Sequence, residues 1–318
     1  MRMEALNGFR ELLLKSHNLA YFSLIVTVSA IFIYFIFQFS KRFIRNYKNG
    51  FVYNEKIKFN TKKITYISMM VAVSVSITTV ISLTIPITVL PPIRIAFEGV
   101  MIKITGMIFG PIIGLIVGIV TEALTLMFVP SYIHIGYLVV AFSFGFWAGM
   151  TAYSFRLKNK WFTLSLITMF IVLSAAFMFW IMKGMQNLNP DNTRIFGIKV
   201  NPAVFPNLFL GMMGGTLALI YLVTFVLEIK KKDRWLNIIL PIILLCIITE
   251  ILVTVLSAAW ADYQILTPGQ IHDGSNGAEN TYITMVVLRM IQVPVKLLFN
   301  TTILTTVYVV LRPLIKVR

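Results

Sequence analysis

Six ionisable side chains stand within long apolar stretches of this 318-residue sequence, and they are the first candidates for chemistry. Three are acids and three are bases: Glu98, Lys103, Glu122, Glu250, Arg289 and Lys296. Charged groups in apolar surroundings are costly, so they usually either pair with one another or face a cavity that receives a ligand. The sequence leaves both roles open.

Four polar residues near the C-terminus follow a helical spacing. They are separated by three, four and four positions, which places them on one helix face: Arg289, Gln292, Lys296 and Asn300. Val295 and Leu298 fall elsewhere on that helix. The cationic face could hold an anionic group of a solute. The alternative is internal pairing, for example of Glu250 with Arg289 or Lys296, which would join helices without touching a ligand.

Further candidates lie where apolar stretches meet polar loops. Arg94, Phe97 and Glu98 follow two prolines, and Arg94 could reach a solute or snorkel toward lipid head groups. His134 could contact a solute or be an isolated polar loop residue. Six aromatic residues could stack on a flat ring, although interfacial belt positions explain most of them: Phe97, Phe128, Tyr132, Tyr137, Trp260 and Tyr282.

Motifs for catalysis and metal binding are missing from the sequence. It contains no G-x-x-x-x-G-K-[ST], no H-E-x-x-H and no G-x-S-x-G. Its three histidines and its one cysteine, Cys246, are widely separated and predict neither a metal cluster nor a disulfide. We therefore expect no enzyme activity, no cofactor and no metal. Any ATP hydrolysis must belong to another chain.

The composition predicts an integral membrane protein. Hydrophobic residues make up 58% of the chain and charged residues only 13%, about half of what a soluble surface needs. The net charge is +16, and 18 of the 28 basic residues fall in four short stretches: 41–63, 156–160, 230–234 and 312–318. That loop bias is typical of positive-inside membrane proteins, so we expect no nucleic-acid partner.

An all-α, polytopic membrane helix bundle with about nine transmembrane helices follows from the apolar stretches, since about 20 apolar residues cross a bilayer. The expected helices are 19–39, 64–85, 95–109, 112–128, 136–155, 161–182, 208–229, 236–260 and 285–311. Residues 1–63 form an extra helix and a basic cytoplasmic linker, and residues 64–318 form the bundle. Loops 183–207 and 261–284 lie outside, the second as a mobile lid or a plain connector.

The stretch 95–128 is divided because Gly110 and Pro111 break a helix at its middle. Orientation tests this division, since every crossing moves the next loop to the other side. With two helices, all four basic stretches share one side. We therefore expect the N-terminus outside and the C-terminus in the cytoplasm.

Small residues recur at a four-residue spacing that lets helix backbones approach closely. The sets are Gly106, Gly110, Gly114 and Gly118, then Gly145 with Gly149, and Gly211 with Gly215. Ser68, Ala72 and Ser76 form another stripe on the helix 64–85. That stripe could pack inside the bundle or form an outward groove for another subunit.

Residues 64–155 resemble a known transporter family. The small-residue helix, the segment Ile93 to Phe97, the run Ile104 to Gly118 with its Gly-Pro turn, and the acid Glu122 are similar to the S components of energy-coupling factor (ECF) vitamin transporters. Ile93 to Phe97 and the Phe-Val-Pro turn at 128–130 are most similar to folate-specific members. The start of the helix 285–311 is similar to the family's last helix.

The resemblance implies a vitamin-binding subunit in the cell membrane that docks on a transmembrane coupling subunit bearing two ATPases. A six-helix core would exclude the helix 19–39 and the pair within 161–229. Docking would use Ser68, Ala72 and Ser76. Substrate binding would involve Arg94, Phe97, Glu98, His134, Arg289, Gln292 and Lys296, beneath the loop 86–97.

Three alternatives stay open. The vitamin could be riboflavin or another vitamin rather than folate. A self-sufficient carrier could use Glu98, Glu122 and Glu250 as proton sites, although no internal repeat supports it. A membrane enzyme such as a lipid transferase is the least supported, because no catalytic motif clusters on a loop.

Overall fold

The computed structural model describes residues 12–13, 18–48, 61–84, 99–129, 134–157, 159–183, 194–195, 198–199, 204–266 and 277–315. Among them, the first helices are α2 (Asn18–Lys48), α3 (Thr61–Thr84), α5 (Val100–Phe109), α6 (Pro111–Phe128), α7 (Ile135–Thr151), α8 (Ser154–Leu157) and α9 (Lys160–Lys183). After a two-residue antiparallel pair of β1 (Arg194–Ile195) with β2 (Ile198–Lys199) come α10 (Phe205–Ile229), α11 (Asp233–Ile248), the π-helix η4 (Thr249–Ala258), α12 (Ala259–Leu266) and α13 (Gly277–Ile315).

The helical bundle predicted from the apolar stretches is confirmed. Seven helical spans in the described residues are long and apolar enough to cross a membrane, and α5 and α7 are shorter apolar helices. The chain is therefore a multi-pass membrane protein. The predicted loop 261–284 is wrong in extent, because helix continues through Leu266 and resumes at Gly277. The proposed lid residues between them lie outside the described residues.

The predicted break at Gly110 is confirmed. Gly110 has φ +98°, a left-handed conformation that glycine adopts without a steric penalty, and Pro111 takes the first position of α6. The Gly110 amide still donates to the Gly106 carbonyl at 2.9 Å, which closes α5. Two helices therefore replace the single one that the apolar run would otherwise form.

The small-residue spacing brings α5, α6 and α7 into backbone contact. A Cβ on Gly145 would lie 1.9 Å from the Gly114 carbonyl oxygen, and one on Gly149 would lie 2.2 Å from the Pro111 nitrogen. For Gly211 and Gly215 the expectation of close packing is wrong, since a Cβ on either would meet no atom within 4 Å. The spacing there lies on an exposed face of α10.

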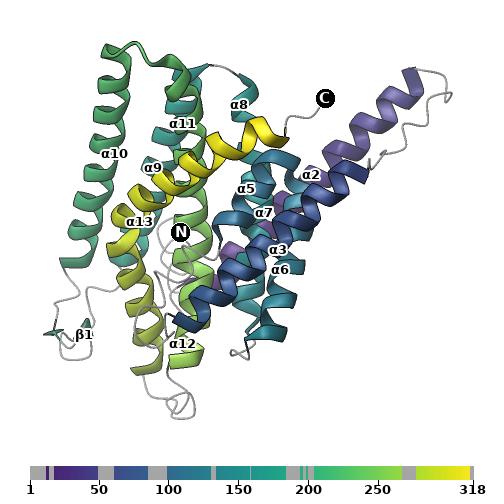
Figure 1. The fold of residues 1–318 in the computed structure, drawn as a ribbon. Coiled ribbons are helices and arrows are strands. Elements are labelled where there is room, and N and C mark those ends of the chain that lie inside the picture. Colours follow the sequence, from purple (N-terminus) through teal and green to yellow (C-terminus); the bar gives the residue numbers. More distant parts are fainter. Residues whose placement is uncertain are drawn as a thin grey trace.

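The helix running from α11 through η4 to α12 occupies the centre of the molecule (Figure 1). Over an apolar 18-residue window, 83% of its residues are buried, against 17% for α10. Helices α5, α6 and α7 lie on one side of it and α9 and α10 on the other, while α13 crosses from α10 to α5 (Figure 1). Glu250 and Asp262 on this central helix are consequently surrounded by protein.

The described ends of the basic stretches lie at one end of the molecule. Figure 1 places the end of α2, the start of α3, α8, the turn between α10 and α11, and the end of α13 in its upper part, with β1 and α12 below. This arrangement is the shared side that the division at Gly110 predicted.

Candidate functional site

The central helix changes from an α-helix to the π-helix η4 in the segment that carries Glu250. In η4 the Thr254 hydroxyl donates to the Thr249 carbonyl five residues earlier, at 3.1 Å. Such wide turns are rare and often occur at functional sites. The sequence predicted an ordinary helix over 236–260, because the apolar pattern carries no signal for the extra residue per turn.

Arg289 of α13 is held in a fully partnered group, here called the arginine cluster: Tyr137, Thr254, Asp262 and Arg289. Arg289 Nε donates to Asp262 Oδ2 at 2.9 Å, and its Nη2 bonds the same oxygen. Its Nη1 donates to the Thr254 carbonyl at 3.3 Å, and the Tyr137 hydroxyl donates to Asp262 Oδ1 at 2.7 Å. Arg289 is 1% exposed and Asp262 3%, so this is a buried ion pair joining four elements.

Of the two roles left open for Arg289, the structure has internal pairing, but Glu250 is wrong as its example partner, and Asp262 is the residue that sequence reasoning missed. It was placed in an outside loop because Pro and Gly follow it. The apolar run Trp260 to Tyr263 around it was the signal that the helix continues.

A second group, the lysine cluster, lies where α5, η4 and α13 meet: Lys103, Glu250, Gln292, Lys296 and Asn300. Lys103 Nζ lies 3.8 Å from Glu250 Oε1, and Asn300 Nδ2 donates to the same oxygen at 2.9 Å. Lys103 Nζ also lies 4.2 Å from the centroid of the Phe144 ring, a cation–π contact. Lys296 is buried on the same face of α13 as Arg289 and Asn300.

The lysine cluster is incomplete in its hydrogen bonding. Within the part of the chain that the structure describes, five of its buried polar atoms have no hydrogen-bond partner: Lys103 Nζ, Glu250 Oε2, Gln292 Oε1, Lys296 Nζ and Asn300 Oδ1. Leaving a buried donor or acceptor unpaired costs about 1–3 kcal/mol, so water or a ligand is needed to satisfy these groups. The arrangement offers two ammonium donors and three carbonyl or carboxylate acceptors.

The predicted polar face of the last helix is confirmed. Arg289, Lys296 and Asn300 are all buried, whereas Val295 is 72% exposed and Leu298 47% exposed on the other side of α13. The structure divides this face between the two clusters.

His134 lies at the start of α7 and is neither isolated nor free. Its Nδ1 accepts a hydrogen bond from the Gly136 amide at 3.0 Å, which caps the helix, and its Nε2 bonds Gln264 Oε1 of α12. Because Nδ1 accepts, the neutral ring carries its proton on Nε2. Its ring also meets Trp260 edge to face, with centroids 4.7 Å apart.

The candidate aromatic residues divide by burial. Trp260 and Tyr282 are buried rather than interfacial, and the Tyr282 hydroxyl donates to the Leu256 carbonyl at 3.1 Å. Phe128 is 66% exposed, as an interfacial belt residue would be. Phe97, Tyr132, Arg94, Glu98 and the loop 86–97 lie outside the described residues, so their roles stay predictions.

The stripe on α3 faces outward. Ser68, Ala72 and Ser76 are all exposed, while Ser74 and Thr78 are buried on the face that packs against α5 and α6. The sequence left open whether this stripe packs inside the bundle or faces outward, and in the structure it faces outward.

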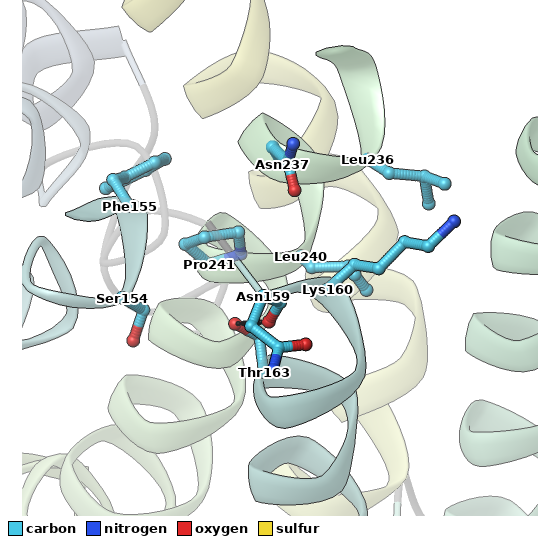
Figure 2. A pocket seen from close by; sticks show the side chains of 9 residues that line it. All are labelled: Ser154, Phe155, Asn159, Lys160, Thr163, Leu236, Asn237, Leu240 and Pro241. Carbon is cyan, nitrogen blue, oxygen red and sulfur yellow. Dashed lines mark hydrogen bonds between the residues drawn. The ribbon is translucent and has the colours of Figure 1, made fainter. Parts of the chain in front are cut away.

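A small cavity lies between α8, α9 and α11 (Figure 2), at the end of the molecule where the ends of the basic stretches gather. Its volume is about 10 Å³, room for one water molecule and far below that of a vitamin. Lys160 extends away from it and bonds Glu228 at 2.7 Å and Asp233 at 3.1 Å. Hydrogen bonding to Glu228, and then to Asp233, raises the pKa of Lys160.

Comparison with known proteins gives one match. Residues 58–223 match the family described as ECF-type riboflavin transporter, S component. Searches among curated proteins and among solved structures find no match for this chain. The matched span runs from just before α3 into α10. It includes the stripe on α3, the turn at Gly110, all of α9 and most of α10, and it ends before η4 and α13.

That span is more than half of the 318 residues, and S components are transport subunits that bind substrate rather than enzymes. The chain therefore belongs to the family of ECF-type riboflavin transporter S components.

Proposed function

We propose that this protein is the membrane-embedded riboflavin-binding subunit of an ECF importer, with the lysine cluster forming part of the binding site. The observation that carries the proposal is that five buried polar atoms on α5, η4 and α13 have no hydrogen-bond partner among the described residues, around the contacts of Glu250 with Lys103 and Asn300. The description of the matching family supports the choice of a flavin. Transport would draw on ATP hydrolysis by two partner ATPases.

Charge favours riboflavin over a folate-like vitamin. The sequence suggested folate because Ile93 to Phe97 and the turn at 128–130 resemble folate-specific members, and a cationic helix also suits a dicarboxylate. In the structure Asp262 neutralises Arg289, and Glu250 lies beside Lys103. Among the described residues, Lys296 is therefore the one cation of the two clusters without an acidic side chain in ion-pair contact. A dianion would find only about one compensating charge here. A neutral ring with a hydroxylated chain can both donate to acceptors and accept from ammonium groups.

The predicted entrance to the site is at the end of the bundle that carries α12. His134 lies there, where its Nε2 bonds Gln264 and its ring meets Trp260. We propose that Arg94, Phe97 and Glu98 complete this entrance from the preceding loop. Folate remains the second candidate substrate, should that loop supply the missing positive charge.

The partner surface is proposed to be the exposed stripe on α3. Ser68, Ala72 and Ser76 leave a shallow, small-residue face on which a helix of the coupling subunit can pack closely. The basic ends gathered at one end of the molecule favour a cytoplasmic C-terminus.

The test is a titration of the full-length chain, purified in detergent, with riboflavin and separately with folate. Riboflavin fluorescence should fall on binding, and folate should not compete. Gln292→Leu should weaken riboflavin binding by about fivefold, the worth of one hydrogen bond. Val295→Leu on the exposed side of the same helix is the matched control. The proposal fails if riboflavin does not bind, and the second candidate replaces it if folate binds instead.

A further inference from the structure

An apolar groove opens on the surface of the molecule between α10, α11 and α13. Its volume is about 330 Å³, within the range of ligand pockets. Leu219 and Val223 of α10, Ile239 of α11, and Leu298 of α13 form its apolar walls. The groove is separate from the lysine cluster, because Lys103, Glu250 and Lys296 do not line it.

Polar groups enter the groove from α13. Thr302, Thr305 and Thr306 line it, and the hydroxyls of Thr302 and Thr306 donate to carbonyls one turn earlier in the helix. The Thr305 hydroxyl is buried and has no hydrogen-bond partner among the described residues. Because the Thr305 hydroxyl is buried, the groove itself presents mainly apolar side chains, with the exposed Thr302 and Thr306 beside them, and this surface suits an acyl chain.

The groove opens beneath a cationic turn. Trp235 lines its mouth, and the turn immediately before it exposes four basic residues: Lys230, Lys231, Lys232 and Arg234. The acids of the same region, Glu228 and Asp233, both bond Lys160. Together with Lys160, the four basic residues of the turn make five bases against these two acids, so this region carries a net positive charge.

We propose that this groove binds an anionic phospholipid, with one acyl chain along α10, α11 and α13 and the phosphate at the turn 230–234. From Trp235 to Ile243 the groove follows α11 for about 12 Å, close to the roughly 15 Å depth of one hydrocarbon leaflet. Basic pockets between membrane helices bind anionic lipid head groups in this way. Charge favours a lipid over an apolar partner helix, which would leave the four bases unpaired.

The bound lipid would also restrain the substrate helix. The face of α13 that lines the groove carries Leu298 and Thr305, and the same helix presents Lys296 and Asn300 to the lysine cluster. We therefore expect lipid to stabilise the protein whether or not substrate is bound.

The experiment uses the full-length chain, stripped of lipid in detergent and then given phosphatidylglycerol or phosphatidylcholine. Native mass spectrometry counts retained lipid, and thermal unfolding measures stabilisation. Phosphatidylglycerol should be retained and should raise the melting temperature more than phosphatidylcholine. Equal retention of the two lipids, or no retention, would overturn the proposal. If glycerophosphoglycerol, which has no acyl chains, raised the melting temperature as much as phosphatidylglycerol does, the proposal that an acyl chain binds in the groove would be overturned.

Two variants with matched controls separate the head-group and acyl-chain contacts. Replacing Lys230, Lys231, Lys232 and Arg234 by Gln should weaken phosphatidylglycerol binding by about a hundredfold or more, since each charge near a membrane surface contributes severalfold. The control replaces four other bases by Gln: Lys41, Arg42, Arg45 and Lys48. An equal loss in this control would show general charge attraction and refute the site.

The second variant, Thr302→Trp, fills the groove from an exposed position and should abolish retention of the lipid. Val310→Trp places the same ring at another exposed position of α13 and should not. If the Thr302→Trp variant still retained phosphatidylglycerol, the proposal that an acyl chain binds in the groove would be refuted. None of these outcomes depends on riboflavin, so the lipid site and the substrate site can fail independently.

Discussion

The arginine cluster and the lysine cluster both contain a buried acid of the central helix and a buried base of α13, yet they differ in completeness. In the arginine cluster Asp262 accepts from Arg289 and Tyr137, and Arg289 also reaches a backbone carbonyl. In the lysine cluster Glu250 keeps an unpartnered oxygen within the described residues, and Lys296 has no hydrogen-bond partner there. Complete pairing fastens helices together, whereas incomplete pairing leaves groups for a ligand.

The largest effect should come from breaking the complete cluster. Asp262→Ala leaves the Arg289 guanidinium buried and uncompensated, which typically costs about 3–5 kcal/mol of stability. Thermal unfolding in detergent should show a greatly lowered melting temperature. Adding Arg289→Met should restore much of the loss, because the uncompensated charge is then removed. A single variant as stable as the wild type would remove the distinction between the clusters.

A smaller loss of stability should follow from separating α6 from α7, the helix that carries Tyr137. Gly145→Ala places a Cβ 1.9 Å from the Gly114 carbonyl oxygen, so α6 and α7 must move apart. Such overpacking costs about 1–3 kcal/mol, measured as a lower melting temperature.

Gly215→Ala is the matched control for this prediction, since nothing lies within 4 Å of the added methyl group. It should be neutral or stabilising by up to about 1 kcal/mol, the difference in helix propensity between the two residues. Equal losses in the two variants would contradict the packing contrast between α7 and α10.

Changing the incomplete cluster should affect binding more than stability. Lys296→Met removes a buried ammonium without a hydrogen-bond partner among the described residues, so the melting temperature should stay the same or rise. Riboflavin affinity should fall about tenfold, or roughly 1.4 kcal/mol, measured by fluorescence titration. If Lys296→Met instead lowers the melting temperature as Asp262→Ala does, both clusters are structural.

The smallest effect on the isolated chain should come from the stripe on α3, which contacts neither cluster. Ala72→Trp adds an exposed ring and should change neither melting temperature nor riboflavin binding. Uptake by cells carrying the complete transporter should nevertheless be lost, because the coupling subunit can no longer approach. Leu83→Trp, at a 72% exposed position nearer the end of α3, should leave uptake intact. Loss of binding in Ala72→Trp would point to a packing role.

Much of the fold could be predicted because its signals are local. Apolar stretches long enough for a bilayer gave the helices, and a glycine followed by a proline gave the break at 110. The spacing of Arg289, Lys296 and Asn300 predicted that they share the buried face of α13. Each of these inferences needs only the rise and period of one helix.

The partners of those residues were decided by the tertiary structure alone. Asp262, rather than Glu250, meets Arg289, because the π-helix and the helical extension to Leu266 set the direction in which each acid points. The same glycine spacing is buried in α7 and exposed in α10, because only packing supplies a neighbouring helix. A sequence fixes the faces of a helix through its period, but the rotation of one helix against another depends on all the contacts between them.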